Sequence, residues 1–237
     1  MIRSRLPLVS FTFDDFPKSA WRRGGTILRA FGLRGTYYAS FGLMNATTPS
    51  GEMFSVEDVK SLIEEGHELG CHTFDHCDSW KTKPTIFERS VVRNRWALEE
   101  ILPGVSFRTL AYPISEPRPL IKRIVSRYFM CCRSGGRSPN VGTIDLNALG
   151  ACFLEQNRNN PKSLKELIDR NRRERGWLVF ATHDISNFPT PYGCTPRFFE
   201  DIVDYALGSG ARVVPVAEAL AMLTDSLSPV MDAEDIP

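Results

Sequence analysis

The sequence predicts an α/β fold built on a parallel sheet, and three observations support this prediction. Short apolar runs alternate with segments of helical periodicity along most of the chain, as in repeated βαβ units. The chain has 237 residues, which suits one large domain or two small ones. Its composition is 42% hydrophobic, enough to bury a sizeable core. With right-handed crossovers, the sheet either stays open or closes into a barrel of seven or eight strands.

Seven runs have the length and apolar character of buried strands, and they define the expected sheet. These runs are residues 7–13, 35–40, 67–72, 108–112, 128–132, 177–182 and 211–214. Segment 133–160 is rich in Gly, Ser, Asn and Pro, so we expect a long loop or an irregular insertion there. The residues from about 226 onward have little apolar content and predict a flexible tail.

Helix start signals lie between the predicted strands. Ser55 precedes an amphipathic stripe, and Thr85 with Glu88 has the spacing of a capping box. Pro161 and the pair Thr195-Pro196 are typical of a first helical turn. Each predicted helix follows a predicted strand, which favours the parallel arrangement.

The charge balance and the cysteines exclude some classes of protein. Lys and Arg total 29 against 28 Asp and Glu, and this near-neutral balance argues against a nucleic-acid binder. No apolar run approaches the length of a transmembrane helix, and no signal peptide is recognisable, so we expect a cytoplasmic protein. The six cysteines show no metal-binding or disulfide spacing, and we expect reduced thiols.

Titratable residues follow several of the predicted strands. The pair Asp14-Asp15 follows the first run, His72 ends the third run and His76 lies just beyond it, and His183 follows the sixth. The carboxyl ends of parallel strands form one face in α/β folds, and active sites lie there. We therefore expect these side chains to converge on one rim.

His72 and His76 are separated by three residues, a spacing that brings both imidazoles to one side of a turn or helix. Two imidazoles and one carboxylate form a three-ligand site with an open position, as catalytic zinc requires. The pair alone is also compatible with solvated or capping histidines. An aspartate on the neighbouring rim favours the metal site.

Two motifs give the chain a resemblance to a known family. The residues Thr12-Phe13-Asp14-Asp15 read TFDD, and His72-Thr73-Phe74-Asp75-His76 read H-[ST]-x-x-H. In this order and spacing they resemble the polysaccharide deacetylases with a NodB homology domain, carbohydrate esterase family 4. The resemblance runs from about residue 8 to 223. It implies a distorted (β/α) barrel, often of seven strands, in a single domain over residues 1–225, with residues 226–237 as a tail.

The resemblance also implies a role for each motif residue. Asp15, His72 and His76 would bind a divalent metal ion, usually zinc. Asp14 would be the general base and His183 the general acid. These roles agree with the chemistry of the groups, because a metal activates water, a carboxylate accepts a proton and an imidazole can protonate an amine.

The chain departs from the family's third and fourth motifs. Ala111 stands where the family often has an arginine that pairs with the base, and Arg108 cannot be assumed to replace it. The resemblance implies that the backbone N–H of Ile114 would bind the oxyanion. The fourth motif is not recognisable, and Asp145 is only a candidate to orient His183.

The expected function is removal of an N-acetyl group from an acetylated amino sugar, in an oligosaccharide, a polysaccharide or a lipid- or nucleotide-linked precursor. Trp80, Phe188 and Tyr192 lie in predicted loops, where they would either stack on a sugar or pack locally. O-deacetylation, C–N hydrolysis of a non-sugar amide or cyclic ureide, and silent metal-holding carbohydrate binding remain as alternatives. The sequence gives neither the sugar nor the oligomeric state.

Overall fold

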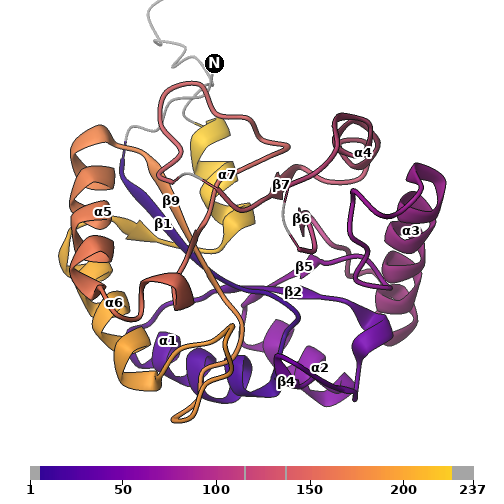
Figure 1. The fold of residues 1–237 in the computed structure, drawn as a ribbon, viewed down its shortest axis with the longest axis horizontal. Coiled ribbons are helices and arrows are strands. Elements are labelled where there is room, and N and C mark those ends of the chain that lie inside the picture. Colours follow the sequence, from indigo (N-terminus) through magenta and orange to yellow (C-terminus); the bar gives the residue numbers. More distant parts are fainter. Residues whose placement is uncertain (1–5, 115, 137, 226–237) are drawn as a thin grey trace, which may run out of the picture.

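The computed structural model describes residues 6–114, 116–136 and 138–225, and it forms a curled sheet with helices around it (Figure 1). All strand pairs of this sheet are parallel, in the order β7-β6-β5-β2-β1-β9-β8. The strands are β1 (Leu8–Phe13), β2 (Thr36–Ala39), β5 (Glu68–Cys71), β6 (Thr109–Ala111), β7 (Cys131–Arg133), β8 (Cys152–Phe153) and β9 (Trp177–Thr182). The expected distorted (β/α) barrel in a single domain is therefore confirmed.

Strand β1 is the centre of the sheet, and every one of its residues is buried. It pairs with β9 over its whole length. On its other side, β10 (Arg212–Val213) pairs with its first half and β2 with its second half. Because of this arrangement, the residues that follow β1 lie in the middle of the carboxyl end of the barrel.

The chain between β7 and β8 closes the gap between the two outer strands. The Cys132 N–H donates to Leu146 O at 2.7 Å, the Leu149 N–H donates to Cys132 O at 2.9 Å, and β8 then pairs with β9. Strand β8 lies in segment 133–160, where the sequence predicted a long loop or an irregular insertion, and the prediction did not include this strand. The strand has two residues, too few for a recognisable apolar run.

Seven α-helices and a π-helix over Ala20–Gly25 are present in the described residues. The helix predicted after Ser55 is present, and Ser55 forms a capping box with Asp58. The Thr195 side chain accepts from the Phe198 N–H at 3.3 Å. The predicted box at Thr85 is wrong, because the helix begins one residue earlier, at Pro84. The α-helices are α1 (Thr26–Ala30), α2 (Val56–Glu64), α3 (Pro84–Ile101), α4 (Pro119–Val125), α5 (Pro161–Glu174), α6 (Pro196–Gly208) and α7 (Val216–Asp225).

Short elements complete the described chain. Two short strands, β3 (Thr47–Thr48) and β4 (Gly51–Glu52), pair in an antiparallel hairpin. Turns of 3₁₀-helix cover Phe41–Leu43 and Glu155–Asn157. None of the helices in the described residues is both long and apolar enough to cross a membrane. The predicted tail, residues 226–237, lies outside the described residues.

The core consists of two clusters on the two faces of the sheet, because side chains alternate along each strand. Phe11 and Phe13 of β1 pack against Phe199 of α6 in the outer cluster. Leu8 and Trp177 belong to the inner cluster, together with apolar residues of α7. Helix α7 therefore covers the amino end of the barrel and leaves the carboxyl end open for a site. All six cysteines, each within the described residues, are free thiols.

Candidate active site

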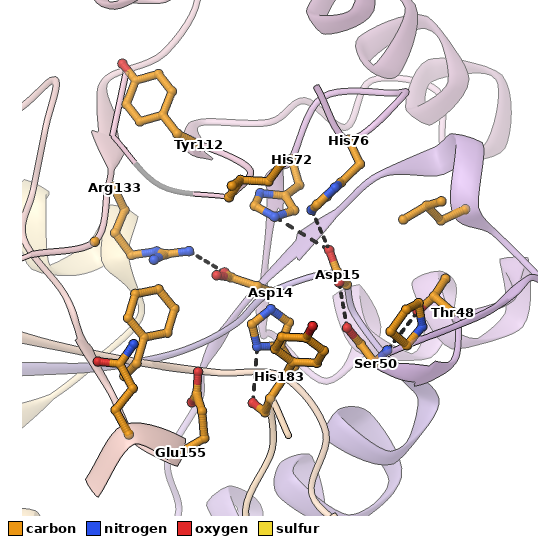
Figure 2. A pocket seen from close by; sticks show the side chains of 17 residues that line it. Asp14, Asp15, Thr48, Ser50, His72, His76, Tyr112, Arg133, Glu155 and His183 are labelled. Atoms are coloured by element: carbon orange, nitrogen blue, oxygen red, sulfur yellow. Dashed lines mark hydrogen bonds and ion pairs between the residues drawn. The ribbon is translucent and has the colours of Figure 1, made fainter. Parts of the chain in front are cut away.

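A cavity of about 580 Å³ lies at the carboxyl end of the barrel, and most of the predicted site residues line it (Figure 2). Its walls come from the ends of β1, β5, β6, β7 and β9, which are far apart in the sequence. The structure thus brings together, as predicted, the residues Asp14, Asp15, His72, His76, Ile114 and His183.

Asp14 and Asp15 both reach the cavity because the chain leaves the strand conformation between them. The Asp14 N–H still donates to Thr182 O at 2.9 Å, which continues the ladder between β1 and β9. Asp15 and Phe16 then take left-handed φ values of 61° and 56°. Consecutive residues of a regular strand point to opposite faces. The left-handed turn breaks this alternation, and two adjacent carboxylates enter one site.

Asp15, His72 and His76 form a cluster whose ligand atoms all lie within 4.8 Å of one another. The Oδ1 atom of Asp15 is 3.6 Å from Nε2 of His72 and 3.1 Å from Nε2 of His76. Nδ1 of His72 lies 2.8 Å from Ala111 O, a contact that requires a proton on Nδ1 and so leaves the Nε2 lone pair facing Asp15. Nitrogen and carboxylate oxygen are the ligand types that divalent zinc takes in catalytic sites.

The protonation states of these groups also fit a divalent cation. Burial lowers the pKa of His72 to about 4, so its ring is neutral near pH 7, the form that can ligate a metal. Burial raises the pKa of Asp15, but the adjacent His76 and His72 outweigh this effect and hold it well below its usual range. Oδ1 of Asp15 is a buried oxygen without hydrogen-bond partner among the described residues. An ion between the three side chains would satisfy it.

The loop that carries the two histidines is fixed by its own side chains. Thr73 has a left-handed φ of 56°, and its hydroxyl accepts from the Cys77 N–H at 2.9 Å. The hydroxyl of Ser90, on α3, accepts from the Phe74 and Asp75 N–H groups at 3.0 and 2.9 Å. Thr73 thus caps the turn, and Ser90 of α3 holds the turn against the barrel.

Asp14 forms an ion pair with Arg133, the last residue of β7, and both side chains are almost completely buried (Figure 2). Burial raises the pKa of Asp14, but the Arg133 charge, with smaller effects of His72 and His183, lowers it overall. Asp14 is therefore a carboxylate, as a proton acceptor must be. The sequence does not mark Arg133 as a site residue, because the apolar run that predicts this strand stops at residue 132.

Arg133 supplies the positive charge that the third motif lacks at Ala111. Its guanidinium also lies over the Tyr38 ring, 5.2 Å from the centroid. Arg108 does not fill this role: it directly precedes β6, at the amino end of the barrel, where its charge acts on Glu68. The pairing of a buried arginine with the first aspartate is thus present in space but comes from another strand.

His183 follows β9, and its ring is held by a backbone carbonyl. Nδ1 lies 3.2 Å from Tyr192 O, which fixes the proton on Nδ1 and leaves Nε2 free of that contact. The loop that carries Tyr192 is fixed by Asp184, whose carboxylate accepts from the Thr190 N–H at 3.0 Å. Gly193 must be glycine, because a Cβ there would lie 2.1 Å from Asp184 O.

Asp145, the candidate to orient His183, is a wrong assignment. Its carboxylate pairs with Lys122 and accepts from the Asn147 N–H at 3.0 Å. The Tyr192 carbonyl performs the orienting role that the sequence analysis gave to a carboxylate. A backbone group leaves no signal in the sequence.

Ile114 lines the cavity with a left-handed φ of 72° and a side chain that is 63% exposed. The structure thus places the backbone of this residue, in a sparsely populated conformation, at the cavity wall. Its role as oxyanion donor stays a prediction.

Glu155 is a further residue of the cavity wall that the sequence analysis did not identify. Burial raises its pKa to about 8, and the nearby Asp14 carboxylate adds to this effect. Its Oε2 atom is buried without a hydrogen-bond partner in the part of the chain that the structure describes. It follows the unpredicted strand β8, and no local pattern marks it.

The three loop aromatics lie in different environments. Tyr192 lines the cavity, whereas Phe188 and Trp80 do not. Phe188 is 93% exposed. Trp80 is also exposed, and its Nε1–H donates to Glu116 O at 3.0 Å. Tyr192 is therefore the one of these three that is in a position to contact a molecule inside the cavity.

The fold and this set of side chains define a (β/α) barrel with a candidate metal site at the carboxyl ends of its parallel strands. The sequence model of the polysaccharide deacetylase family matches residues 3–128, more than half of the chain. The chain belongs to that family. The expectation drawn from the two motifs is thereby confirmed, and the family is one of deacetylases, which are hydrolases.

Similar proteins extend the comparison. A region of 167 residues is 28% identical to a protein named gellan lyase from a Bacillus species, and it covers 62% of this chain and 7% of that protein. The chain thus spans a small part of this curated relative.

Solved structures of low sequence identity share the fold. A family 4 carbohydrate esterase pseudoenzyme from Bacillus anthracis is 13% identical, with a TM-score of 0.65 and coverage of 92% of this chain and 66% of that one. A family 4 acetyl xylan esterase from Clostridium thermocellum, solved with a cobalt ion, is 17% identical, with a TM-score of 0.61 and coverage of 91% of both chains.

Proposed function

We propose that the protein is a metal-dependent hydrolase that removes N-acetyl groups from an acetylated amino sugar. The observation that carries the proposal is the adjacency of two differently held carboxylates. Asp15 lies in the cluster with two imidazoles, and Asp14 lies beside it, paired with Arg133. One carboxylate is placed to hold a cation and the other to accept a proton, which is the division that hydrolysis of an amide by activated water requires.

Asp15, His72 and His76 would hold the divalent ion, with zinc as the proposed metal. When bound, such an ion lowers the pKa of water and polarises a carbonyl group. Asp14 takes the proton from the attacking water. Its ion pair with Arg133 keeps it deprotonated and restricts its orientation, so that the carboxylate is ready before the substrate arrives.

The remaining steps use Ile114 and His183. The backbone N–H of Ile114 donates to the oxygen that becomes negative when water adds to the acetamide carbonyl. His183 gives a proton to the departing amine from Nε2, because Nδ1 is engaged with Tyr192 O. The C–N bond breaks, and acetate and a free amino sugar are the products.

The substrate class is proposed from the family and the cavity together. The chain belongs to the polysaccharide deacetylases, and the cavity of about 580 Å³ has room for an acetylated sugar. Tyr192 offers a ring at the cavity wall that can stack on a pyranose.

The proposal is tested by incubating the protein, stripped of metal and reloaded with Zn²⁺, with a panel of acetylated compounds. The panel contains N-acetylated amino-sugar oligomers, O-acetylated xylan oligomers and a small cyclic ureide. Mass spectrometry should show loss of an acetyl group from the N-acetylated sugars, with equal release of acetate and amine. The His76→Ala protein should be inactive. Asp145 is an exposed carboxylate outside the cavity, so the Asp145→Ala protein should be fully active.

Two results would overturn the proposal. Turnover of the cyclic ureide without deacetylation would assign the site to other C–N bonds. Saturable binding of the oligomers without acetate release, at full metal occupancy, would make the protein a carbohydrate-binding member of the family.

A further inference from the structure

The hairpin of β3 and β4 lies against the turn that carries Asp15. The Phe54 N–H donates to Phe16 O at 3.2 Å, and Met53 bridges to Pro17 on the same side. The tip of the hairpin borders the cavity, because the residues that line the cavity include Thr48, Pro49 and Ser50. A segment that the motifs do not include therefore touches the candidate metal site.

Ser50 is the contact between this hairpin and the metal cluster. Its hydroxyl donates to Oδ2 of Asp15 at 2.9 Å, and the residue is only 5% exposed (Figure 2). The Ser50 backbone is itself fixed, because its N–H donates to the Thr48 hydroxyl at 3.1 Å. The Ser50 hydroxyl is thus a buried donor at a defined position.

The two oxygens of Asp15 have different partners. Oδ2 accepts the Ser50 hydroxyl, whereas Oδ1 faces Nε2 of His72 and of His76. A carboxylate can bind a cation through one oxygen or through both. With Oδ2 engaged by a hydroxyl, Oδ1 is the oxygen left for the cation.

We propose that Ser50 is a positioning residue for the metal site, which rests on the proposed function in that the site holds a divalent ion. Its hydroxyl holds the carboxylate of Asp15 so that Oδ1 alone binds the ion. The cluster then contributes three ligand atoms, one from each side chain, and leaves the rest of the coordination shell to water and substrate. Hydrogen bonds to a ligand typically change metal affinity by about 10–100-fold.

The His72 ring is restrained in the same way by Ala111 O, at 2.8 Å from Nδ1. Two of the three ligands are therefore oriented by a hydrogen bond from outside the cluster. The Ser50 bond differs because a side chain makes it, so a single substitution can remove it. This makes the contribution of the orienting bond measurable.

The experiment measures Co²⁺ binding to the full chain by competition with a chromophoric chelator and records the visible absorption of the bound ion. Ser50→Ala should weaken Co²⁺ binding by about 10–100-fold and change the absorption spectrum, because Oδ2 becomes free to bind. Ser50→Thr, which keeps the hydroxyl, should restore both affinity and spectrum.

Ser79→Ala is the matched control. Ser79 is also a buried serine on a loop at this rim, but its hydroxyl donates to Glu116 O at 3.0 Å and does not touch the cluster. Its Co²⁺ affinity and spectrum should equal those of the unmodified protein. Thermal unfolding of the metal-free proteins should show that the Ser50 and Ser79 variants fold alike.

Wild-type affinity and spectrum in Ser50→Ala would overturn the inference while leaving the deacetylase proposal intact. A protein that binds Co²⁺ but removes no acetyl group would overturn the proposed function, and the Ser50 comparison would still give its result. A wild-type protein that binds no divalent ion would overturn both.

Discussion

A buried carboxylate lies at the carboxyl end of the barrel and a half-buried one at the amino end, and their surroundings differ. At the carboxyl end, Asp14 meets the guanidinium of Arg133. At the amino end, Glu68 accepts hydrogen bonds from the hydroxyls of Thr36 and Thr109, at 2.9 and 2.5 Å, and from the Ala217 N–H at 2.8 Å. Asp14 thus has a charged partner, whereas the hydrogen-bond donors to Glu68 are neutral.

The pKa values of the two groups move in opposite directions. Burial raises both, but the charge of Arg133 reverses the effect at Asp14, whereas the hydrogen bonds to Glu68 leave its pKa raised. A buried carboxylate that must accept a proton needs a cation beside it. A carboxyl group that ties α7 to the sheet needs only donors. The comparison separates a group kept ready for chemistry from a group used for assembly.

The largest expected effect comes from removing the proton acceptor at the carboxyl end. Asp14→Asn keeps the shape of the side chain but cannot take a proton, and kcat should fall by about 10²–10⁴-fold. Metal content, measured by elemental analysis, should stay at the wild-type level. Joint loss of metal and activity would make Asp14 a ligand or a structural group instead.

His183→Ala should separate the acid from the rest of the site. On an N-acetylated sugar, the loss of the proton donor should lower kcat by on the order of 10²-fold or more. On a nitrophenyl acetate, whose leaving group needs no proton, kcat should fall far less. Equal losses on both substrates, at normal metal content, would assign His183 to another role.

Arg133→Met tests whether the Arg133 cation causes the opposite pKa shifts of Asp14 and Glu68. The variant leaves Asp14 buried without its partner, which should lower the free energy of unfolding by about 3–5 kcal/mol. Without the cation, burial should raise the pKa of Asp14, so protonation at lower pH should return part of the stability. In the wild type, the lowered pKa of Asp14 contributes stability that is lost as pH falls through that value.

Urea unfolding at pH 5 and pH 7 checks this prediction. The difference in free energy of unfolding between Arg133→Met and the wild type should be smaller at pH 5 than at pH 7. The double variant with Asp14→Asn should recover stability at pH 7, because the unpaired charge is gone. A pH-independent difference would show that Arg133 acts through packing alone.

Glu68 gives the matching experiment at the amino end. Glu68→Ala leaves the Ala217 N–H and two hydroxyls without their acceptor, and should cost about 1–3 kcal/mol of stability. Metal-dependent turnover should be unchanged in the folded protein. Because the folded-state pKa of Glu68 is raised, it favours folding less as pH rises from about 4.5 toward that raised value.

Glu68→Gln should therefore have a flatter dependence of unfolding free energy on pH than the wild type. Urea denaturation between pH 4.5 and pH 8 measures it. Identical pH profiles would mean that Glu68 titrates alike in the folded and unfolded chains.

The smallest effect is expected at Ile114. Glycine accepts the φ of 72° without strain and keeps the N–H, so Ile114→Gly should stabilise the fold by about 0.5 kcal/mol with little change in turnover. Ile114→Pro cannot adopt this φ, since the proline ring fixes φ near −65°. A large loss of turnover in a well-folded Ile114→Gly protein would mean that the side chain itself contacts the substrate.

The sequence predicted the parts of the site that lie directly after long buried runs. Strand β1 has six buried residues and β9 has six, and Asp14 and His183 follow them immediately. The spacing of His72 and His76 is likewise local. In each case the signal is a pattern within a few residues, which periodicity and spacing can detect.

The missed residues depend on contacts that are distant in sequence. Arg133 reaches Asp14 across 119 positions, from a three-residue strand at the edge of a segment that the sequence predicted as a loop. Ser50 reaches Asp15 from a hairpin of two-residue strands. His183 is oriented by the Tyr192 carbonyl, which every residue type provides. Only the folded chain shows these partners.

The origin of the arginine beside Asp14 bears on how relatives of this chain are sorted into active and inactive members. A search that requires arginine at the position of Ala111 would reject this sequence, although the guanidinium stands next to the aspartate. The electric field at Asp14 depends on how far away the charge is and not on which strand contributes it. Evolution can therefore move such a residue from one strand to its neighbour without moving its charge. Inactive relatives are therefore better recognised by the groups that surround the aspartate in space than by the residue type at one motif position.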